Sequence, residues 1–259
     1  MSTTLFARFR QAILDYPGAT TAVQPLPVDL LLAHEGALSV YYAPFDYVNP
    51  DAKVVVLGIT PGLTQAANAL VAARAALARG QADQEALQLA KRTAGFSGTM
   101  RGTLVELLDA VGLQRHLGIA STAELFETRA DWLQTASALA FPTFLDGKNY
   151  NGTPDMRRQP LLKGLLTSHL VPLLQSLPQA TFIPLGPKPT EALDWVAHTH
   201  GVRPVRVLRG LPHPSGANAE RIAYFLGRKP RHLLSSKTDP DRLDAAKREI
   251  VAQLEGGRP

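Results

Sequence analysis

Cysteine is absent from the 259 residues of the chain. This absence excludes a disulfide framework, zinc held by cysteines, a thiol nucleophile and a cysteine-bound iron–sulfur cluster. The chain also lacks a run of about 18 apolar residues, which is the length that a transmembrane helix needs. Residues 1–9 lack the basic and then apolar pattern of a signal peptide. We therefore expect a cytoplasmic protein without membrane contact.

The common cofactor and nucleophile motifs are missing as well. There is no G-x-G-x-x-G fingerprint and no P-loop lysine motif, so a dinucleotide or ATP site is not favoured. The G-F-S-G of residues 95–98 is not the G-x-S-x-G nucleophile elbow. His198 and His200 are two positions apart on an expected helix and point to different faces, so they make a poor metal pair. We expect neither a metal nor another cofactor.

What the chain does contain is typical of a folded globule with a small basic excess. Hydrophobic residues make up 45% and charged residues 19% of the chain, which excludes a disordered tail. Lys and Arg number 27 against 22 for Asp and Glu, which gives a net charge of +5. This balance is compatible with a polyanionic partner and does not establish one.

Strand and helix patterns alternate along the chain. Residues 53–59 (KVVVLGI) form the clearest strand, because consecutive β-branched residues are typical of a strand buried on both faces. Three further strands are expected over 134–141, 181–185 and 205–208, and residues 38–42 suit an extended segment. The expected helices cover 3–15, 27–33, 64–92 with a division near Gly80, 101–112, 161–177 with a kink or break near Pro172, 190–200 and 219–226. The alternation predicts an α/β fold with an open, mostly parallel four-stranded sheet and helices on both faces.

No composition shift or long linker divides the chain, so we expect one domain over residues 1–259. A helical extension is expected on the N-terminal side, at residues 1–37, and another on the C-terminal side, at residues 239–255. Asp239 would cap the C-terminal helix and Pro240 would occupy its first turn.

Three unusual loops follow expected strands. They are 58–62 (G-I-T-P-G), the polar loop at 146–155 and 211–218 (L-P-H-P-S-G-A-N). In open α/β sheets, sites form at the carboxyl ends of the strands. If the sheet is parallel, all three loops face the same rim, and we expect the candidate site there.

Two of these loops resemble motifs of the uracil-DNA glycosylase superfamily. In that superfamily a G-x-x-P-G-type loop follows the first core strand and an H-P-S-x-x-N-type loop follows the last, as G-I-T-P-G (58–62) and H-P-S-G-A-N (213–218) do here. The G-F-S of residues 95–97 resembles the segment whose phenylalanine stacks on the flipped base, and 185–186 resembles the third strand and its turn. The resemblance covers roughly residues 50–230, and it is closest to the mismatch-specific and single-strand-selective branches.

This resemblance implies a monomeric, monofunctional DNA glycosylase that hydrolyses the N-glycosidic bond of uracil or a related damaged base. Its partner would be DNA that contains uracil, a damaged base or an abasic site. His213 would hydrogen-bond the carbonyl oxygen of the departing base and stabilise its developing negative charge, while Phe96 would stack on the base. A non-catalytic protein of the same fold that binds uracil or abasic DNA is an alternative. An unrelated α/β enzyme acting on a small molecule is a second alternative.

The first loop departs from the superfamily pattern at the position that places water. Relatives carry Asp or Asn there, or Glu one residue earlier, whereas this chain has Thr60 and Ile59. A threonine hydroxyl can hold a water but cannot act as a base near neutral pH. The sugar cation is itself highly electrophilic, so a water held by Thr60 is one possibility. A carboxylate that activates the water is the other, with Asp46 as the first candidate and Asp155 as the second.

Base recognition departs from the pattern too. Gly62 stands where the classical enzymes carry a tyrosine that blocks the thymine methyl group, so a 5-substituted pyrimidine would fit. The end of the second core strand, where relatives carry an asparagine, offers only Ser137 as a polar side chain, and Asn149 or Asn151 in the next loop could supply the amide. The expected substrate-binding residues are Gly58, Ile59, Pro61, Gly62, Phe96, Ser137, Asn149 and Asn151.

Contact with DNA is expected from the last motif and from basic residues near the site. The classical enzymes insert a leucine wedge into the duplex after H-P-S, whereas here Gly216 and Ala217 are small and Arg221 would fill the gap. The expected DNA-binding residues are Ser215, Gly216, Ala217, Asn218, Arg221 and Arg101. Further basic residues lie where phosphates would be expected, namely Lys91, Arg92, Arg157, Arg158, Arg228, Lys229 and Arg231.

Overall fold

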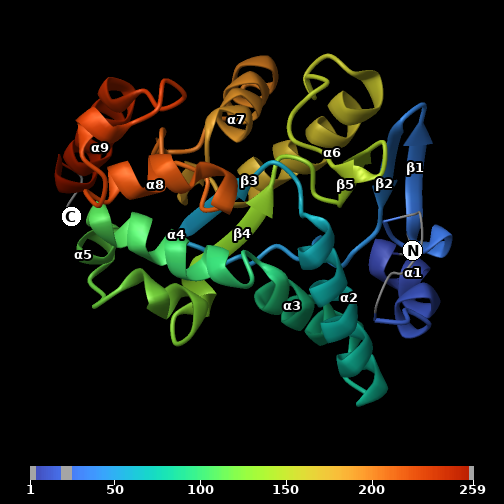
Figure 1. Cartoon of the computed structure of the whole chain (residues 1–259). Coiled ribbons are helices and arrows are strands. Elements are labelled where there is room, and N and C mark those ends of the chain that lie inside the picture. Colours follow the sequence, from blue (N-terminus) through green and yellow to red (C-terminus); the bar gives the residue numbers. More distant parts are fainter. Residues whose placement is uncertain (1–3, 19–24, 257–259) are drawn as a thin grey trace. The chain divides into compact units, whose positions relative to one another are not determined.

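The computed structural model describes residues 4–18 and 25–256. The chain divides into two compact units, each built from segments that are distant in the sequence. The first unit comprises Met1–Val48, Ile59–Gly95 and Thr135–Gln175, and the second comprises Asn49–Gly58, Phe96–Gln134 and Ser176–Pro259. Figure 1 colours the chain by residue number, from blue at the N-terminal side to red at the C-terminal side. The expectation of one domain over residues 1–259 stays a prediction.

The first unit contains an antiparallel sheet that the sequence did not predict. Its strands are β1 (Leu31–Glu35), β2 (Leu38–Tyr41), β5 (Thr143–Leu145) and β6 (Lys148–Asn149), in the order β1-β2-β5-β6. β1 and β2 form a hairpin around Gly36, whose φ of +59° suits a tight turn.

The helix expected over 27–33 and the helical extension over 1–37 are therefore wrong in part. Only a short 3-10 turn, η1 (Val28–Leu30), precedes β1. Cross-strand pairing with β2 outweighs the helical preference of the Leu and Ala residues in this segment.

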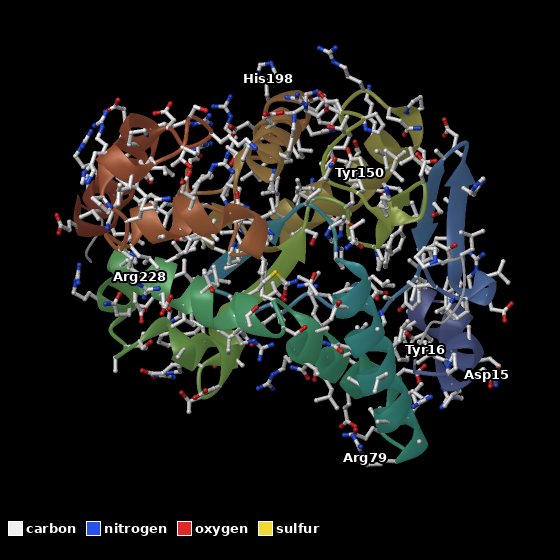
Figure 2. The ribbon with its side chains drawn as sticks, viewed as in Figure 1. Asp15, Tyr16, Arg79, Tyr150, His198 and Arg228 are labelled. Carbon is white, nitrogen blue, oxygen red and sulfur yellow. The ribbon has the colours of Figure 1, made fainter. Side chains whose placement is uncertain are left out.

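Four helices complete the first unit, namely α1 (Leu5–Leu14), α2 (Leu63–Ala78), α3 (Asp83–Ala94) and α6 (Pro160–Ser176). The expected division of 64–92 is confirmed, because α2 ends just before Gly80, whose φ is +76°. Small alanines line the buried faces of α2 and α3, which allows these helices to pack closely. At the end of α1, Asp15 is exposed and Tyr16 is buried (Figure 2). No break occurs at Pro172, since α6 continues through it.

The second unit is built around the predicted parallel sheet. Its strands β3 (Val54–Gly58), β7 (Thr181–Pro184) and β8 (Arg206–Val207) pair in parallel, and β4 (Leu133–Ser137) follows β3 at the other side, giving the order β4-β3-β7-β8. All residues of β3 and β7 are buried. The predicted open α/β fold with a four-stranded sheet is therefore confirmed, with β4 ending at Ser137 rather than at Phe141.

Helices α4 (Thr99–Ala110), α5 (Leu113–Leu117), α7 (Pro187–His200), α8 (Ala219–Phe225) and α9 (Pro240–Gly256) surround this sheet (Figure 1). The apolar faces of α4, α5, α8 and α9 share one core with the strand residues Val54, Val56 and Ile183. The C-terminal helix begins at Pro240, as predicted, and Asp239 caps it by accepting a hydrogen bond from the Arg242 N–H at 3.1 Å. Among the described helices, none combines the length and apolarity that crossing a membrane requires.

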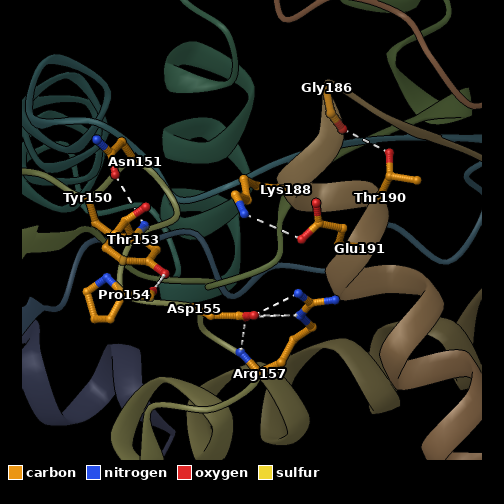
Figure 3. Close-up of polar contacts among 10 residues, drawn as sticks. All are labelled: Tyr150, Asn151, Thr153, Pro154, Asp155, Arg157, Gly186, Lys188, Thr190 and Glu191. Atoms are coloured by element: carbon orange, nitrogen blue, oxygen red, sulfur yellow. Dashed lines mark hydrogen bonds and ion pairs between the residues drawn. The ribbon is translucent and has the colours of Figure 1, made fainter.

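The turn from β7 into α7 is held by its own side chains. Gly186 adopts a φ of +83°, a conformation that glycine tolerates and larger residues resist. The Thr190 hydroxyl donates to the Gly186 carbonyl at 2.8 Å, and Lys188 pairs with Glu191 at 3.5 Å (Figure 3). Pro187 occupies the first helical turn, where no intrahelical N–H bond is needed.

Candidate functional site

The loop that contains H-P-S-G-A-N follows β8 in the second unit. The Gly186 N–H donates to the Leu211 carbonyl at 3.0 Å, and a Cβ added at Gly186 would meet the Cβ of His213 at 4.0 Å. The carboxyl end of β7 and the His213 loop therefore lie side by side, as expected for neighbouring parallel strands.

His213 is positioned by its own loop. The Ser215 backbone N–H donates to Nδ1 of His213 at 3.3 Å, so Nδ1 is the acceptor and a neutral ring carries its proton on Nε2. The side chain is half-buried, and this burial lowers the pKa of His213 below its ordinary value. The ring is therefore neutral at physiological pH and can donate a hydrogen bond from Nε2.

Phe96 lies next to His213 in the same unit. Their ring centroids are 6.4 Å apart and the ring planes meet at 49°. Phe96 has a φ of +50°, which is uncommon for a bulky residue and marks local backbone strain. It is also 6% exposed and belongs to the apolar core, so its stacking on a base stays a prediction.

Ser215, Asn218 and Arg221 form a hydrogen-bonded chain behind the His213 loop. Asn218 Nδ2 donates to Ser215 Oγ at 3.3 Å, and Arg221 donates to Asn218 Oδ1 at 2.8 Å. Arg221 also donates to the Lys237 carbonyl at 2.9 Å. These contacts make Arg221 a support of the loop, whereas the sequence predicted that it would fill the place of a duplex wedge. Gly216 and Ala217 are exposed at the tip.

Most of the expected DNA-facing cations are bound to other side chains. Arg101 lies 5.0 Å from the ring centroid of Phe126. Arg228, labelled in Figure 2, pairs with Glu106 at 3.0 Å. The remaining pairs are Lys229 with Glu220 at 2.7 Å, Arg231 with Asp241 at 2.6 Å and Arg157 with Asp155 at 2.7 Å. These acidic partners offset much of the positive charge that the sequence predicted for phosphate contact.

Thr60 lies in the first unit, and its hydroxyl forms hydrogen bonds with the backbone of two distant residues. The hydroxyl donates to the Phe141 carbonyl at 2.8 Å and accepts from the Thr143 N–H at 3.1 Å. The hydroxyl proton is therefore committed to a carbonyl, and Thr60 ties the G-I-T-P-G loop to the start of β5. This geometry favours a structural role over the predicted placement of water.

Thr60→Ala is accordingly expected to lower the free energy of unfolding by about 1–3 kcal/mol, because it removes the acceptor of the Thr143 N–H and one of the two hydroxyl donors to the Phe141 carbonyl. If the chain has the activity that the resemblance implies, the excision rate of the folded variant is expected to fall by about tenfold or less. Chemical denaturation and a single-turnover assay measure the two effects, with Thr64→Ala, at an exposed position of α2, as the control. Unchanged stability together with a rate loss well beyond tenfold would return the water-placing role to Thr60.

Gly62 and Asn149 are brought together at the beginning of α2. Asn149 Oδ1 accepts from the Leu63 N–H at 3.0 Å, and a Cβ added at Gly62 would meet Asn149 Nδ2 at 3.4 Å. Asn149 is exposed, so its amide is accessible beside the glycine. Of the two predicted amide readers, Asn149 therefore lies with the G-I-T-P-G loop.

The second amide and the second carboxylate lie in turns of their own. Asn151 Oδ1 accepts from the Thr153 N–H at 3.2 Å, which is a local turn contact (Figure 3). Asp155 binds the Arg157 guanidinium and also accepts from its backbone N–H at 2.9 Å (Figure 3). Both arrangements are typical of structural residues.

Asp46 is held by a hydroxyl and lies in a partly buried environment. The Tyr42 hydroxyl donates to Asp46 Oδ1 at 3.0 Å. Burial raises the pKa of Asp46, while the hydrogen bond from Tyr42 and the charge of Lys91 act in the opposite direction. A carboxylate whose pKa is raised toward neutrality has the property that a general base requires.

Of two neighbours of this region, sequence reasoning missed His169 and assigned Lys91 to phosphate contact, whereas the fold buries it. Lys91 on α3 is 5% exposed, and burial lowers its pKa to about 7. His169 on α6 makes a hydrogen bond with the backbone of Ser137, and burial together with the charge of Lys91 lowers its pKa to about 3. Its Nε2 is buried and has no hydrogen-bond partner among the described residues. The Q-L-A-K and S-H-L patterns around these two residues are typical of ordinary helix, and only the tertiary fold places them beside Asp46 and Ser137.

Comparison with known proteins places the chain in a family. No family model matches it, and no solved structure matches it significantly. YoxB of Bacillus subtilis (strain 168), described as an uncharacterized protein, is 34% identical over 220 residues, which cover 84% of this chain and 86% of YoxB. The chain belongs to the YoxB family.

The match to YoxB is longer than either compact unit, so it takes in residues of both. The description of YoxB carries no reaction, and the activity of this member must be argued from its own residues.

Proposed function

We propose that this member of the YoxB family is a DNA glycosylase of the uracil-DNA glycosylase type. It hydrolyses the N-glycosidic bond of uracil or a related damaged base and thereby initiates base excision repair. The observation that carries the proposal is the arrangement of His213, which offers Nε2–H from the H-P-S-G-A-N loop and lies beside Phe96. A histidine of this loop and a stacking phenylalanine are the pair that the resemblance to the superfamily implies.

Hydrolysis of the N-glycosidic bond requires a hydrogen-bond donor that stabilises the departing anionic base. Breaking the bond between the sugar and the base leaves an oxocarbenium-like sugar and negative charge on the pyrimidine. His213 donates from Nε2 to the carbonyl oxygen where this charge develops, and a neutral ring suffices as the donor. The partial burial of His213 strengthens this hydrogen bond, because an electrostatic contact is stronger where water is excluded.

Asp46 is proposed to handle the water. The water oxygen bonds to the sugar carbon, its proton passes to the Asp46 carboxylate, and the bonding pair of the broken bond leaves with the base. Thr60 is a poor candidate for this task, because its hydroxyl proton is held by Phe141. Gly62 leaves room for a 5-substituted pyrimidine, and the Asn149 amide beside it offers both a donor and an acceptor to a base edge.

Phe96→Ala is expected to weaken the binding of uracil-containing DNA by about 1–3 kcal/mol, the usual effect of losing an aromatic ring that stacks on a base. Fluorescence anisotropy with a uracil-containing oligonucleotide measures the change. Leu104→Ala is the matched control, since Leu104 lies in the same core and its loss lowers only stability. Equal binding by both folded variants would assign Phe96 to the core alone.

A second candidate function is non-catalytic binding of uracil or abasic DNA. The observation that favours it is Thr60, which stands at the water-placing position and uses its hydroxyl within the protein. On this alternative the chain would retain uracil-containing DNA without releasing the base.

An excision assay over a panel of modified bases, in single- and double-stranded DNA, tests the proposal. Glycosylase activity yields free base and an unbroken strand with an abasic site, which alkali then cleaves. Retention of the labelled strand with no free base would select the binding alternative. Absence of both release and salt-sensitive DNA binding would point to an enzyme that acts on small molecules.

A further inference from the structure

Lys91 makes an unusual set of contacts for a lysine. Its side chain is buried on α3, and an ammonium in such a place is costly unless it is paired and hydrogen-bonded. Nζ donates to the Phe45 carbonyl at 2.6 Å and also to the Tyr47 carbonyl. These two carbonyls belong to the residues on either side of Asp46, so the ammonium fixes the backbone before and after that carboxyl group.

The other side of Asp46 is fixed by an aromatic residue. The Tyr42 hydroxyl donates to Asp46 Oδ1, and the Tyr42 ring stacks on Phe9 with centroids 4.7 Å apart and planes at 9°. Phe141 packs against the same ring at 5.5 Å. The carboxyl group is thus held between a lysine on α3 and a tyrosine that the core immobilises.

Lys91 and Asp46 each shift the pKa of the other. Burial raises the pKa of Asp46 and lowers that of Lys91 to about 7, and each charge opposes the change that burial causes in the other. The remaining titratable groups that act on this cluster are Tyr42 after β2, His169 on α6 and Asp83 at the start of α3. Burial keeps Tyr42 and His169 neutral at physiological pH, and the protonated form of Lys91 favours the ionised carboxylate of Asp46.

We propose that Lys91 is a positioning residue for base excision, which holds Asp46 in place through the two flanking carbonyls and stabilises its carboxylate form. This inference rests on the proposed function. It adds to that function the residue that keeps the partly buried carboxylate of Asp46, the proposed general base, ionised. Lys91 itself does not touch the substrate, because its ammonium is enclosed by the protein.

The test compares pH–rate profiles under single-turnover conditions. Lys91→Met removes the charge and is expected to move the acidic limb to higher pH, and a limb that moves by one pH unit lowers the rate at low pH about tenfold. The affinity for uracil-containing DNA is expected to stay within about twofold, which separates positioning from substrate contact. Lys163→Met, an exposed lysine of α6, is the matched control. An unchanged limb in folded Lys91→Met overturns the proposal.

The absence of cysteine from the chain allows a selective rescue. Lys91→Cys can be alkylated in denaturant with 2-bromoethylamine and refolded, which restores an ammonium at one position. The restored side chain is expected to return the acidic limb toward that of the wild type, and alkylation with iodoacetamide is expected not to. Equal profiles after both alkylations overturn the role of the charge.

A reciprocal measurement needs no change at Lys91 and no activity. Coupling between two charges acts equally in both directions. Asp46→Asn is therefore expected to lower the pKa of the Lys91 amine, measured by nitrogen NMR, whereas Asp155→Asn is expected to leave it unchanged. An amine that titrates identically in Asp46→Asn and wild type contradicts the coupling. If the coupling holds while the wild type releases no base, the proposed function fails and the arrangement of Lys91 with Asp46 stands.

Discussion

His213→Ala is expected to lower the single-turnover rate of uracil excision by about two to three orders of magnitude. A preorganised donor aimed at a developing anion contributes this much in other enzymes. The structure gives the reason for preorganisation, because the Ser215 N–H occupies Nδ1 and leaves the ring proton on Nε2. Burial lowers the pKa of His213, so the neutral donor is present at the working pH without further cost.

The control for this prediction is His198→Ala. His198, labelled in Figure 2, is exposed on α7, which ends at His200 and so does not include the His213 loop. Its loss is expected to leave the excision rate within about twofold, as is usual for a surface substitution away from a site. A folded His213→Ala variant with a rate close to that of His198→Ala would remove His213 from the chemistry.

Asp46→Asn is expected to lower the excision rate by about 100-fold or more, the effect of losing a general base. The rate of the wild type is expected to rise with pH as Asp46 ionises, because only the carboxylate accepts a proton from water. Since burial raises the pKa of Asp46, this acidic limb lies above the range of an ordinary aspartate. The limb is expected to disappear in Asp46→Asn.

Stability provides the internal check on Asp46. A carboxyl group whose pKa is raised in the folded state contributes stability at low pH and loses it as pH rises through the raised pKa. At neutral pH, Asn therefore removes an unfavourable buried charge, while it also deprives Lys91 of its counter-charge. The two effects oppose each other, and the free energy of unfolding is expected to change little. Asp15→Asn, at the exposed end of α1, is the control; a rate loss in Asp46→Asn that merely follows a loss of folded protein would argue against a role as base.

The sequence predicted the parallel sheet because its signals are local. The β-branched run of β3 and the glycine that ends it are visible in a short window, and so is Gly80 between α2 and α3. The antiparallel sheet was missed because β2 pairs with β5, about a hundred residues further along the chain. No local pattern announces such a partner, and Leu and Ala in residues 31–33 favour helix when they are considered alone.

In the candidate site too, local motifs revealed some residues, while the contacts of others became visible only in the folded structure. His213 and Phe96 were found through short motifs, and the structure places their rings side by side. The structural role of Thr60 could not be predicted from the sequence. Its two hydrogen-bond partners, Phe141 and Thr143, are 81 and 83 residues away along the chain. Lys91 was counted among the surface cations, whereas the fold buries it against the carbonyls that flank Asp46. Contacts between residues that are distant in the sequence produce no local motif or spacing, so they cannot be inferred from the sequence alone.

The most direct measurement of the central claim is the release of free uracil from a single-stranded oligonucleotide that contains one uracil, followed by chromatography under single-turnover conditions. Wild-type protein is expected to release the base and to leave an intact strand that alkali cleaves at the abasic position. His213→Ala in the same experiment is expected to release it about a hundred to a thousand times more slowly. Full binding of the oligonucleotide by wild-type protein with no free uracil, at any pH between 5 and 9, would contradict the assignment as a glycosylase.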